Sequence, residues 1–380
     1  MFQRFERALA EAISQGRIAG AVALVTGRDG VVYEHAAGVR TAGAETPMDA
    51  ATVFWIASMT KAVASVAALQ LVERGQLTLD GDLSDLIPDF KDLQVLTPAG
   101  GLRPAKGPVT LRQLLTHTSG FAYGFTSAEL AAWIQANGFD ANAGNRASWR
   151  QPLLFDPGEG WIYGIGIDWT GLVIEAASGQ RLDAYFQDHI LNPLSMADTG
   201  FAGDPRRAAR TAGVHVRGPE GGLMPIPFGM PADPEVLSGG AGLYSTARDY
   251  GRFLQMLLNG GELDGARLLS EPTVRGLSEV QTGARRAGYI RTAMENLSRD
   301  FDLYPDMATG HGLATMVTPQ ATAEGRGAGS LAWGGLANTY YWADPAAGKA
   351  GLLLTQLLPF GDPEVLELMR ALERGAYATA

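Results

Sequence analysis

Ser58-Met59-Thr60-Lys61 places a hydroxyl and an amine three positions apart. On a helix this spacing puts both side chains on one face, where they can touch. A serine gains from the positive end of a helix dipole, and a lysine inside an apolar helix loses solvation, which lowers its pKa toward that of a useful base. The tetrapeptide alone is common, and a capped helix with a solvated lysine is the alternative. Because Phe54-Trp55-Ile56-Ala57 precedes it and an apolar helix follows, we predict Ser58 as a nucleophile and Lys61 as its base partner.

Tyr163 is a second candidate, about a hundred residues further along the chain. It follows the turn at Pro157-Gly158 and precedes a helix expected to begin near Asp168. Beside a cationic lysine, the ionised form of a buried phenol is favoured, so Tyr163 can accept the Ser58 proton and return it to the leaving group. An ordinary core tyrosine is the alternative.

A third candidate is the run Trp333-Gly334-Gly335-Leu336, in which two glycines lie in a strand context. Glycine within a strand indicates close backbone approach, here by a ligand. The backbone N–H of Leu336, together with that of Ser58, would form an oxyanion hole, commonly the largest single catalytic contribution in acyl transfer. A plain strand bulge is the alternative.

The elements that must position these residues follow from periodicity and turn signals. Residues 21–26 and 31–34 are predicted as a hairpin, and a helix buried on most sides is predicted from Ser58 to about Gly75. The C-terminal runs at 312–317, 338–344 and 350–358 are predicted as strands. A helix capped by Asp362 and Pro363 should end the chain, and the N-terminal segment should also be helical, with Phe5 and Leu9 on one face.

Strands at both ends and helices between them predict an α+β fold, with an antiparallel sheet flanked by helices. We expect one catalytic domain over 1–380, with an α/β subdomain at about 1–79 and 240–380 and an inserted, mainly helical subdomain at about 80–239. Two long irregular loops, 217–236 and 281–309, are expected to wall the site.

Composition excludes several function classes. The chain has 30 Lys and Arg against 40 Asp and Glu, a net charge of −10, which disfavours nucleic acid and anionic membrane partners. It has no cysteine, and its five histidines, His117 among them, lack the spacing of metal ligands, so neither metal nor cofactor is expected. The N-terminus lacks a signal-peptide pattern and no run is long enough for a membrane helix, which predicts a cytoplasmic protein. No oligomeric state is predicted.

In their order and separation, the three candidates resemble the serine β-lactamase and penicillin-binding-protein-like superfamily, most closely its family VIII carboxylesterases. The resemblance spans nearly the whole chain and includes the segments GQLTLDGDLSDLIPDF, LRQLLTHTSGF and LSGGAGLYSTARDYGRF. It implies a nucleophile at Ser58, a base partner at Lys61, a proton relay at Tyr163, and a strand at Trp333 to Leu336 that lines the site.

Two departures from the superfamily pattern bear on the substrate. Ile165 stands where class C β-lactamases and D-Ala-D-Ala peptidases normally carry Asn, and Trp333 stands where they place a cation for a substrate carboxylate. Both favour neutral acyl groups. Short-chain esters are the expected substrates, although acyl length depends on how the two long loops fold over the site. We assign Asp168 to helix capping, and Tyr123 and Trp161 to the substrate pocket, although such aromatic residues are more often packing. Phe121, Phe125 and Met224 are weaker pocket candidates.

The leading hypothesis is therefore a serine carboxylesterase acting on a small-molecule ester through a Ser58 acyl-enzyme. An acyltransferase that passes the acyl group to an alcohol is the nearest alternative, because an alcohol can replace water in the second step. A β-lactamase or peptidase is a further alternative, disfavoured by Ile165 and Trp333. A catalytically silent binding protein is the non-enzyme alternative.

Overall fold

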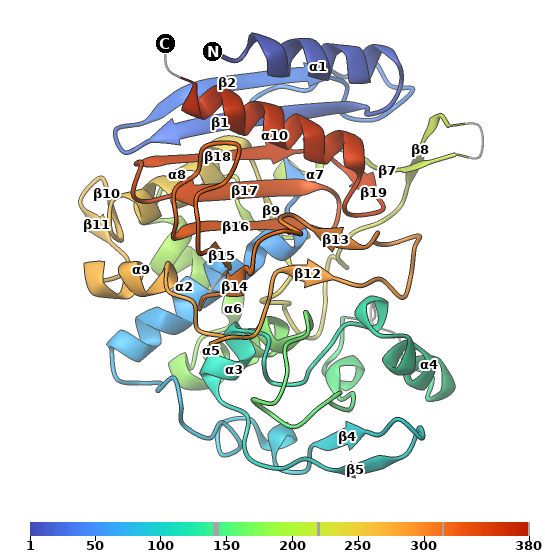
Figure 1. The fold of residues 1–380 in the computed structure, drawn as a ribbon, viewed down its shortest axis with the longest axis vertical. Coiled ribbons are helices and arrows are strands. Elements are labelled where there is room, and N and C mark those ends of the chain that lie inside the picture. The colour runs from blue at the N-terminus through green and yellow to red at the C-terminus, as the bar shows by residue number, and fades with distance from the viewer. Residues whose placement is uncertain (140–143, 219–220, 314, 379–380) are drawn as a thin grey trace.

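The computed structural model describes residues 1–139, 144–218, 221–313 and 315–378. Its centre is an antiparallel sheet in the strand order β14-β15-β16-β17-β18-β1-β2, in which the N-terminal β1 pairs with the C-terminal β18 and β2 forms an edge (Figure 1). The strands are β1 (Gly20–Gly27), β2 (Val31–Gly38), β3 (Phe54–Trp55), β4 (Gln94–Leu96), β5 (Leu102–Pro104), β6 (Gly200–Phe201), β7 (Val214–Arg217), β8 (Leu223–Ile226), β9 (Leu243–Ser245), β10 (Glu262–Leu263), β11 (Ala266–Arg267), β12 (Tyr289–Ile290), β13 (Phe301–Asp302), β14 (Gly310–His311), β15 (Met316–Thr318), β16 (Ser330–Gly335), β17 (Thr339–Asp344), β18 (Lys349–Leu354) and β19 (Leu357–Leu358). The predicted α+β class is confirmed.

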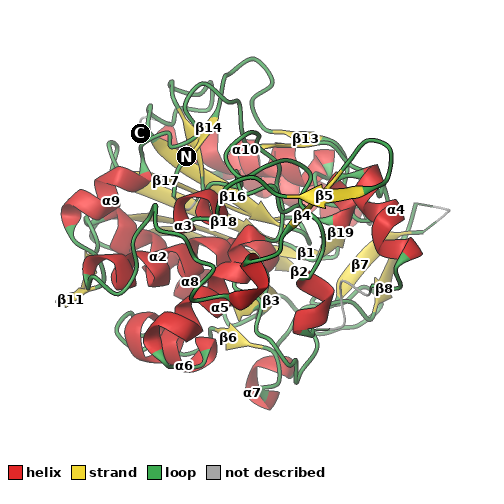
Figure 2. Ribbon diagram, turned by 90° about the horizontal axis from the view of Figure 1, so that it is seen from below, coloured by secondary structure: helices red, strands yellow, loops and turns green. Residues whose placement is uncertain are grey.

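Helices cover both faces of this sheet, as the view from below in Figure 2 shows. Helices α1 and α10 pack together over one face, and α8 packs against β1 and β18 on the other. The helices are α1 (Gln3–Ser14), α2 (Thr60–Glu73), α3 (Leu111–Leu115), α4 (Ala128–Ala136), α5 (Gly166–Ser178), α6 (Leu182–Phe186), α7 (Pro205–Ala208), α8 (Ala247–Leu258), α9 (Glu271–Leu277) and α10 (Pro363–Tyr377). In the described part of the chain, no helix is both long and apolar enough to span a bilayer.

The termini form the elements that local signals predicted. The hairpin of β1 and β2 turns at residues 28–30, and β1 is buried along almost its whole length. Helix α1 buries Phe5 and Leu9, as its spacing predicted. Asp362 caps α10 by accepting hydrogen bonds from the backbone N–H groups of Glu364 and Val365, with Pro363 at the first helical position.

Helix α2 is buried along nearly its whole length, from Thr60 to Leu71. Short side chains, mostly alanine and valine, allow α5 to pack closely against it. The predicted helix is thus confirmed, but Ser58 precedes it and lies in a 3₁₀ turn, η1 (Ala57–Met59).

The segment 80–239 contains α3 to α7 and also strands, which its helical patterns did not predict. Its strands β7 and β8 pair with each other, and β7 pairs in parallel with the C-terminal β19. The predicted loop 217–236 thus includes the short strand β8, and the loop 281–309 includes β12 and β13. The division into two subdomains stays a prediction.

Candidate active site

Ser58 is the middle residue of η1, two positions before the start of α2. The residue before it, Ala57, has φ +42°, a left-handed conformation that costs a non-glycine residue energy and persists only where its surroundings enforce it. Both residues line a cavity, but Ala57 is buried whereas Ser58 is only partly buried. The turn therefore directs the predicted nucleophile out of the core.

Lys61 lies in the first turn of α2 and is only 2% exposed. Its Nζ lies 3.3 Å from the Ser58 Oγ, 2.9 Å from the Tyr123 hydroxyl and 2.8 Å from the Gly240 carbonyl oxygen. An ammonium group has three N–H donors, and these three acceptors satisfy all of them. The predicted contact between the serine and the lysine is present.

Tyr123 joins Lys61 to a buried carboxylate. Its hydroxyl donates to Asp168 Oδ2 at 2.6 Å, and Ser238 Oγ donates to Asp168 Oδ1. Burial, and then the charge of Asp168, raise the pKa of Tyr123 well above its usual value of 10. Tyr123 therefore stays a neutral phenol that accepts from Lys61 and donates to Asp168.

The assignment of Asp168 to helix capping is wrong. Ile165 occupies the N-cap position of α5, and Asp168 lies within the first helical turn. Its carboxylate faces Tyr123 and Ser238 instead of the helix backbone. A buried carboxylate with two hydrogen-bond donors close to Lys61 balances the lysine charge through Tyr123.

Tyr163 is 3% exposed and lines the same cavity as Ser58. Its hydroxyl accepts a hydrogen bond from Trp333 Nε1 at 3.1 Å, and the Nζ of Lys61 lies 4.8 Å from the centre of its ring. The structure thus brings Tyr163, Trp333 and the Ser58–Lys61 pair together.

The second half of β16 lines this cavity through Trp333 and Gly334. Strand β15 pairs with the first half of β16, residues 330–332. Leu336 follows β16 directly and also lines the cavity. From this position the backbone N–H of Leu336 can act as one of the two predicted donors of the oxyanion hole.

The two glycines of β16 serve a different purpose from the one predicted. A Cβ atom on Gly335 would lie 2.2 Å from the carbonyl oxygen of Ile56, and one on Gly334 would lie 2.7 Å from the ring of Tyr340. The chain itself therefore makes a close approach at both glycines, and the approach at Gly335 is to the residue before the turn that carries Ser58. Gly334 still lines the cavity, whereas Gly335 does not.

Trp161, predicted in the substrate pocket, lies outside the cavity lining. Its ring packs against Tyr289 and His117, with ring centres 5.2 Å and 6.3 Å apart. Met224 is 46% exposed on β8 and does not line the cavity either. Tyr123 does line it, as predicted.

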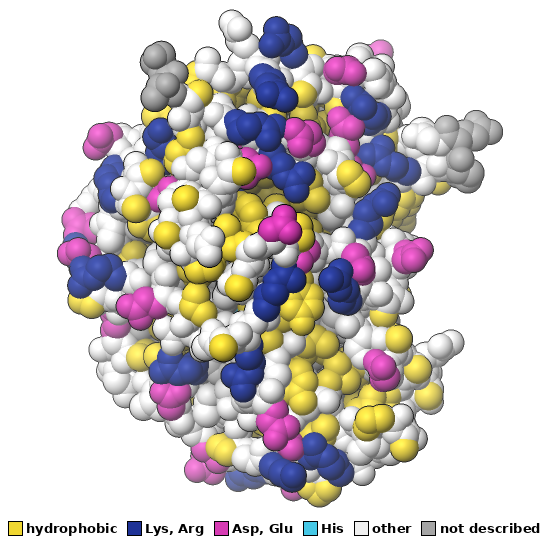
Figure 3. All heavy atoms as spheres, viewed as in Figure 1, with side chains coloured by type: hydrophobic (Ala, Val, Ile, Leu, Met, Phe, Trp, Pro, Cys, Tyr) yellow, Lys and Arg dark blue, Asp and Glu magenta, His cyan; other side chains and the backbone are white. Residues whose placement is uncertain are grey.

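The cavity, called the central cavity below, has a volume of about 790 Å³, within the usual range of small-molecule sites. Hydrophobic side chains gather in the hollowed middle of the molecular face seen in Figure 3. Both predicted loops contribute walls, through Met230 and Met294 among others, and α4 supplies a further wall. Among its described lining residues there is no Lys or Arg, and Asp168 is the one charged side chain. The lining residues used here are Ser58, Tyr123, Ile134, Tyr163, Asp168, Phe228, Met230, Ile290, Met294, Trp333 and Leu336.

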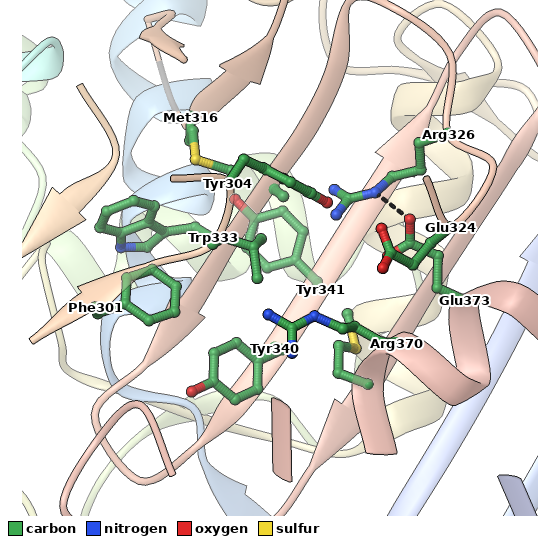
Figure 4. A pocket seen from close by; sticks show the side chains of 13 residues that line it. Phe301, Tyr304, Met316, Glu324, Arg326, Trp333, Tyr340, Tyr341, Arg370 and Glu373 are labelled. Carbon is green, nitrogen blue, oxygen red and sulfur yellow. Dashed lines mark hydrogen bonds and ion pairs between the residues drawn. The ribbon is translucent and has the colours of Figure 1, made fainter. Parts of the chain in front are cut away.

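Behind Trp333 lies a second, much smaller cavity of about 20 Å³ (Figure 4). Arg326 and Glu373 form a buried ion pair there at 2.7 Å, and the guanidinium of Arg326 lies 5.2 Å from the centre of the Tyr304 ring. Burial raises the pKa of Glu373, and the charge of Arg326 opposes that shift. Because it is so small, this cavity serves to back Trp333 and not to hold a substrate.

Asp168, Ser238 and Gly240 belong to the site, but the sequence analysis gave none of them a role there. Ser238 and Gly240 lie in the segment LSGGAG, whose resemblance to the superfamily was noted. A Cβ atom on Gly240 would lie 2.3 Å from the Asp168 carboxylate, so glycine is required where the backbone carbonyl approaches Lys61. The two adjacent glycines in this segment were the sequence signal that could have indicated a close approach of the backbone at the site.

Comparison with known proteins places the chain among relatives of its own length. A model of the Beta-lactamase family matches residues 2–376. The chain is 31% identical to the acyltransferase calJ of Penicillium decumbens, over 88% of this chain and 82% of the relative. It is also 31% identical to the lovastatin esterase of Penicillium rubens, over 96% of each. A mutant of simvastatin synthase from Aspergillus terreus has a similar structure, with a TM-score of 0.85 and 31% identity over 98% of this chain and 96% of that one.

The resemblance inferred from the sequence is thereby confirmed. The relatives include an esterase and an acyltransferase, which makes the chain an enzyme and removes the silent binding protein from consideration. The chain belongs to the beta-lactamase family, among its serine hydrolases and acyltransferases.

Proposed function

We propose that this enzyme hydrolyses neutral carboxylic esters through an acyl-enzyme on Ser58. The observation that carries the proposal is the central cavity itself, where Ser58, Tyr163 and the end of β16 line one apolar space without a lining Lys or Arg among its described residues. The cation next to Ser58, Lys61, is buried and has an acceptor for each of its donors, so a substrate carboxylate would have no free cation to pair with there. A neutral ester has no such need.

In the proposed mechanism Ser58 Oγ attacks the ester carbonyl carbon while its proton passes to Tyr163. Lys61, whose ammonium donors are all occupied, supplies positive charge beside the Ser58 oxygen and near the Tyr163 ring. The Trp333 N–H steadies the Tyr163 oxygen. Tyr163 then gives the proton to the departing alkoxide, and the acyl group stays on Ser58. The N–H groups of Ser58 and Leu336 are the proposed donors to the carbonyl oxygen.

Water or an alcohol can attack this acyl-enzyme, so transfer to an alcohol is a second candidate function. It is favoured by the equal identity of the chain to an acyltransferase and to an esterase. The cavity volume of about 790 Å³ also exceeds what a short acyl chain fills, which leaves space for a bulky alcohol or acyl group. We therefore extend the expected substrates beyond short-chain esters.

The test compares wild type with Ser58→Ala on p-nitrophenyl acetate, butyrate and octanoate, with and without a primary alcohol. Ser65→Ala is the matched control, because Ser65 lies buried on α2 and its hydroxyl has no partner in the described chain. We expect Ser58→Ala to lose ester turnover. We also expect it to lose the increase in protein mass, measured by mass spectrometry, that the bound acyl group causes. Ser65→Ala should keep both. Formation of a new ester in place of free acid would assign acyl transfer. Full ester turnover by Ser58→Ala would contradict the proposal. Hydrolysis of a chromogenic cephalosporin by the wild type tests the β-lactamase alternative.

A further inference from the structure

His117 is a buried histidine to which the proposed mechanism gives no role. It follows α3 directly, is 1% exposed and has φ +58°. Among residues with a side chain, histidine, asparagine and aspartate are the ones that most often adopt this left-handed conformation. The backbone at this point therefore reverses sharply, and the imidazole is directed into the core.

His117 makes hydrogen bonds to the chain on both sides of Tyr163. The N–H of Ile162 donates to the His117 carbonyl oxygen at 3.1 Å, and the N–H of Gly164 donates to His117 Nδ1 at 3.4 Å. The imidazole also packs against the Tyr163 ring, with ring centres 4.8 Å apart. One residue thus holds the two peptide units that flank the tyrosine, and its ring supports the phenol between them.

The bond from Gly164 requires a neutral imidazole with its lone pair on Nδ1 and its proton on Nε2. The surroundings favour that form, because burial, then His311 and then Lys61 lower the pKa of His117 well below 6.5. Lys61 comes from α2 and His311 from β14, whose ring centre lies 5.1 Å from that of His117. The remaining neighbour that can ionise is Tyr163.

The same tautomer leaves a buried donor unsatisfied. Nε2 of His117 has no hydrogen-bond partner in the described part of the chain. An unpaired buried polar atom destabilises the fold, and an apolar residue would avoid that cost. The side chain is therefore better explained by its bond to Gly164 than by packing alone.

Close packing makes the support of Tyr163 rigid. A Cβ atom on Gly164 would lie 2.1 Å from the carbonyl oxygen of Phe121, so the chain after His117 and the chain around Tyr163 run in direct contact. The Tyr163 loop has no room to shift on this side. Trp333 donates to the Tyr163 hydroxyl, and Thr126 Oγ1 donates to the Tyr163 carbonyl oxygen. The two bonds that His117 accepts complete the set that fixes the tyrosine relative to Lys61.

We propose that His117 is a positioning residue for acyl transfer, which fixes the hydroxyl of Tyr163 relative to Ser58 and Lys61 by holding the peptide units on either side of it. The inference rests on the proposed role of Tyr163. It assigns a function to the histidine of the segment LLTHTSGF. The bond that carries it is the one accepted by Nδ1, which a change of side chain can remove while the backbone bond remains.

The test separates the effect of the hydrogen-bond acceptor at His117 Nδ1 from the effect of the positive φ at this residue. His117→Asn keeps an acceptor near the Nδ1 position and tolerates a positive φ, whereas His117→Gly tolerates the same φ without an acceptor. With p-nitrophenyl butyrate we expect His117→Gly to lower kcat about tenfold or more at nearly unchanged KM, since small displacements of catalytic groups cost rate and not binding. His117→Asn should stay within about threefold of wild type by the same reasoning.

His189→Asn and His189→Gly are the matched controls, because His189 also packs on a tyrosine, Tyr185, with ring centres 4.4 Å apart, and does not line the central cavity. Rates are divided by the number of Ser58 hydroxyls that an irreversible phosphonate titrates, which removes losses through unfolding. Equal kcat for His117→Asn and His117→Gly would overturn the inference. If Ser58→Ala were active, the proposed function would fail instead, whatever the histidine variants did.

Discussion

The two sides of the central cavity differ in how tightly the chain holds them. On the sheet side, the turn of Ser58 lies against β16 so closely that Gly335 has no space for a methyl group, and Lys61 has a partner for each donor. On the loop side, α4 buries one of its own residues, Leu130, and the loop residue Met294 is 37% exposed.

This difference indicates a division of work. Groups that move protons must be held within a fraction of an ångström, which close packing and paired polar atoms achieve. Walls that select a substrate can be built from loops, where changes of side chain leave the fold intact. Changes on the sheet side should therefore alter kcat, and changes on the loop side should alter the preference among esters.

The largest effect is expected from Lys61→Met, which keeps the length of the side chain and removes its charge. We expect kcat/KM on p-nitrophenyl butyrate to fall by about 10³-fold or more, because the ammonium supports both Ser58 and Tyr163. Lys349→Met is the control, since Lys349 bonds to the Ala376 carbonyl oxygen away from the cavity. A loss of kcat/KM below tenfold would contradict the view that the sheet side of the cavity holds the groups that set the rate.

Acid should also act on the sheet side, through His311. Burial lowers the pKa of His311 from 6.5 to about 4, so below pH 6.5 the unfolded chain binds a proton that the folded chain does not. The free energy of unfolding then falls between pH 6.5 and 4, by about 3 kcal/mol for this group, and changes no further through it below pH 4. Urea unfolding at pH 7 and pH 4 measures this, and His311→Gln should flatten the dependence by a similar amount. If the free energy of unfolding of His311→Gln depended on pH as in the wild type, His311 would be excluded as the cause of the acid destabilisation.

Gly335→Ala tests the contact between β16 and the Ser58 turn. The added methyl group would lie 2.2 Å from the Ile56 carbonyl oxygen, so one of the two segments must shift. We expect kcat to fall about 10²-fold, the usual cost of a displacement near 1 Å. In the control, Gly276→Ala, the added Cβ meets nothing within 4 Å, and the helix α9 should tolerate it. If Gly335→Ala kept wild-type kcat, close packing would not be what positions the nucleophile.

Much of the sheet side could be predicted from the sequence because its signals are local. The hairpin turn at residues 28–30, the alanine-rich helix after Ser58 and the Asp362-Pro363 cap each lie within one element and need no knowledge of the rest of the chain. The spacing of Ser58 and Lys61 is also a local signal, and the predicted contact between their side chains is present.

Pairings between distant segments could not be predicted. Asp168 bonds to Tyr123 and Ser238, 45 and 70 residues away, and no local pattern distinguishes it from a capping aspartate. Trp161 lies two residues from Tyr163, yet its ring packs against Tyr289 and lies outside the cavity lining. The strained turn at Ala57 likewise depends on the strand it meets, not on its own residues.

The smallest effect is expected on the loop side, from Met294→Ala. Removing part of an apolar wall that is 37% exposed should raise KM for p-nitrophenyl octanoate about fivefold, or about 1 kcal/mol of lost burial, and leave kcat on the acetate within about twofold. Met224→Ala is the control, because Met224 is similarly exposed but outside the cavity lining. A fall in kcat on both esters would mean that the loop also positions the reacting groups, and the division between the two sides of the cavity would not hold.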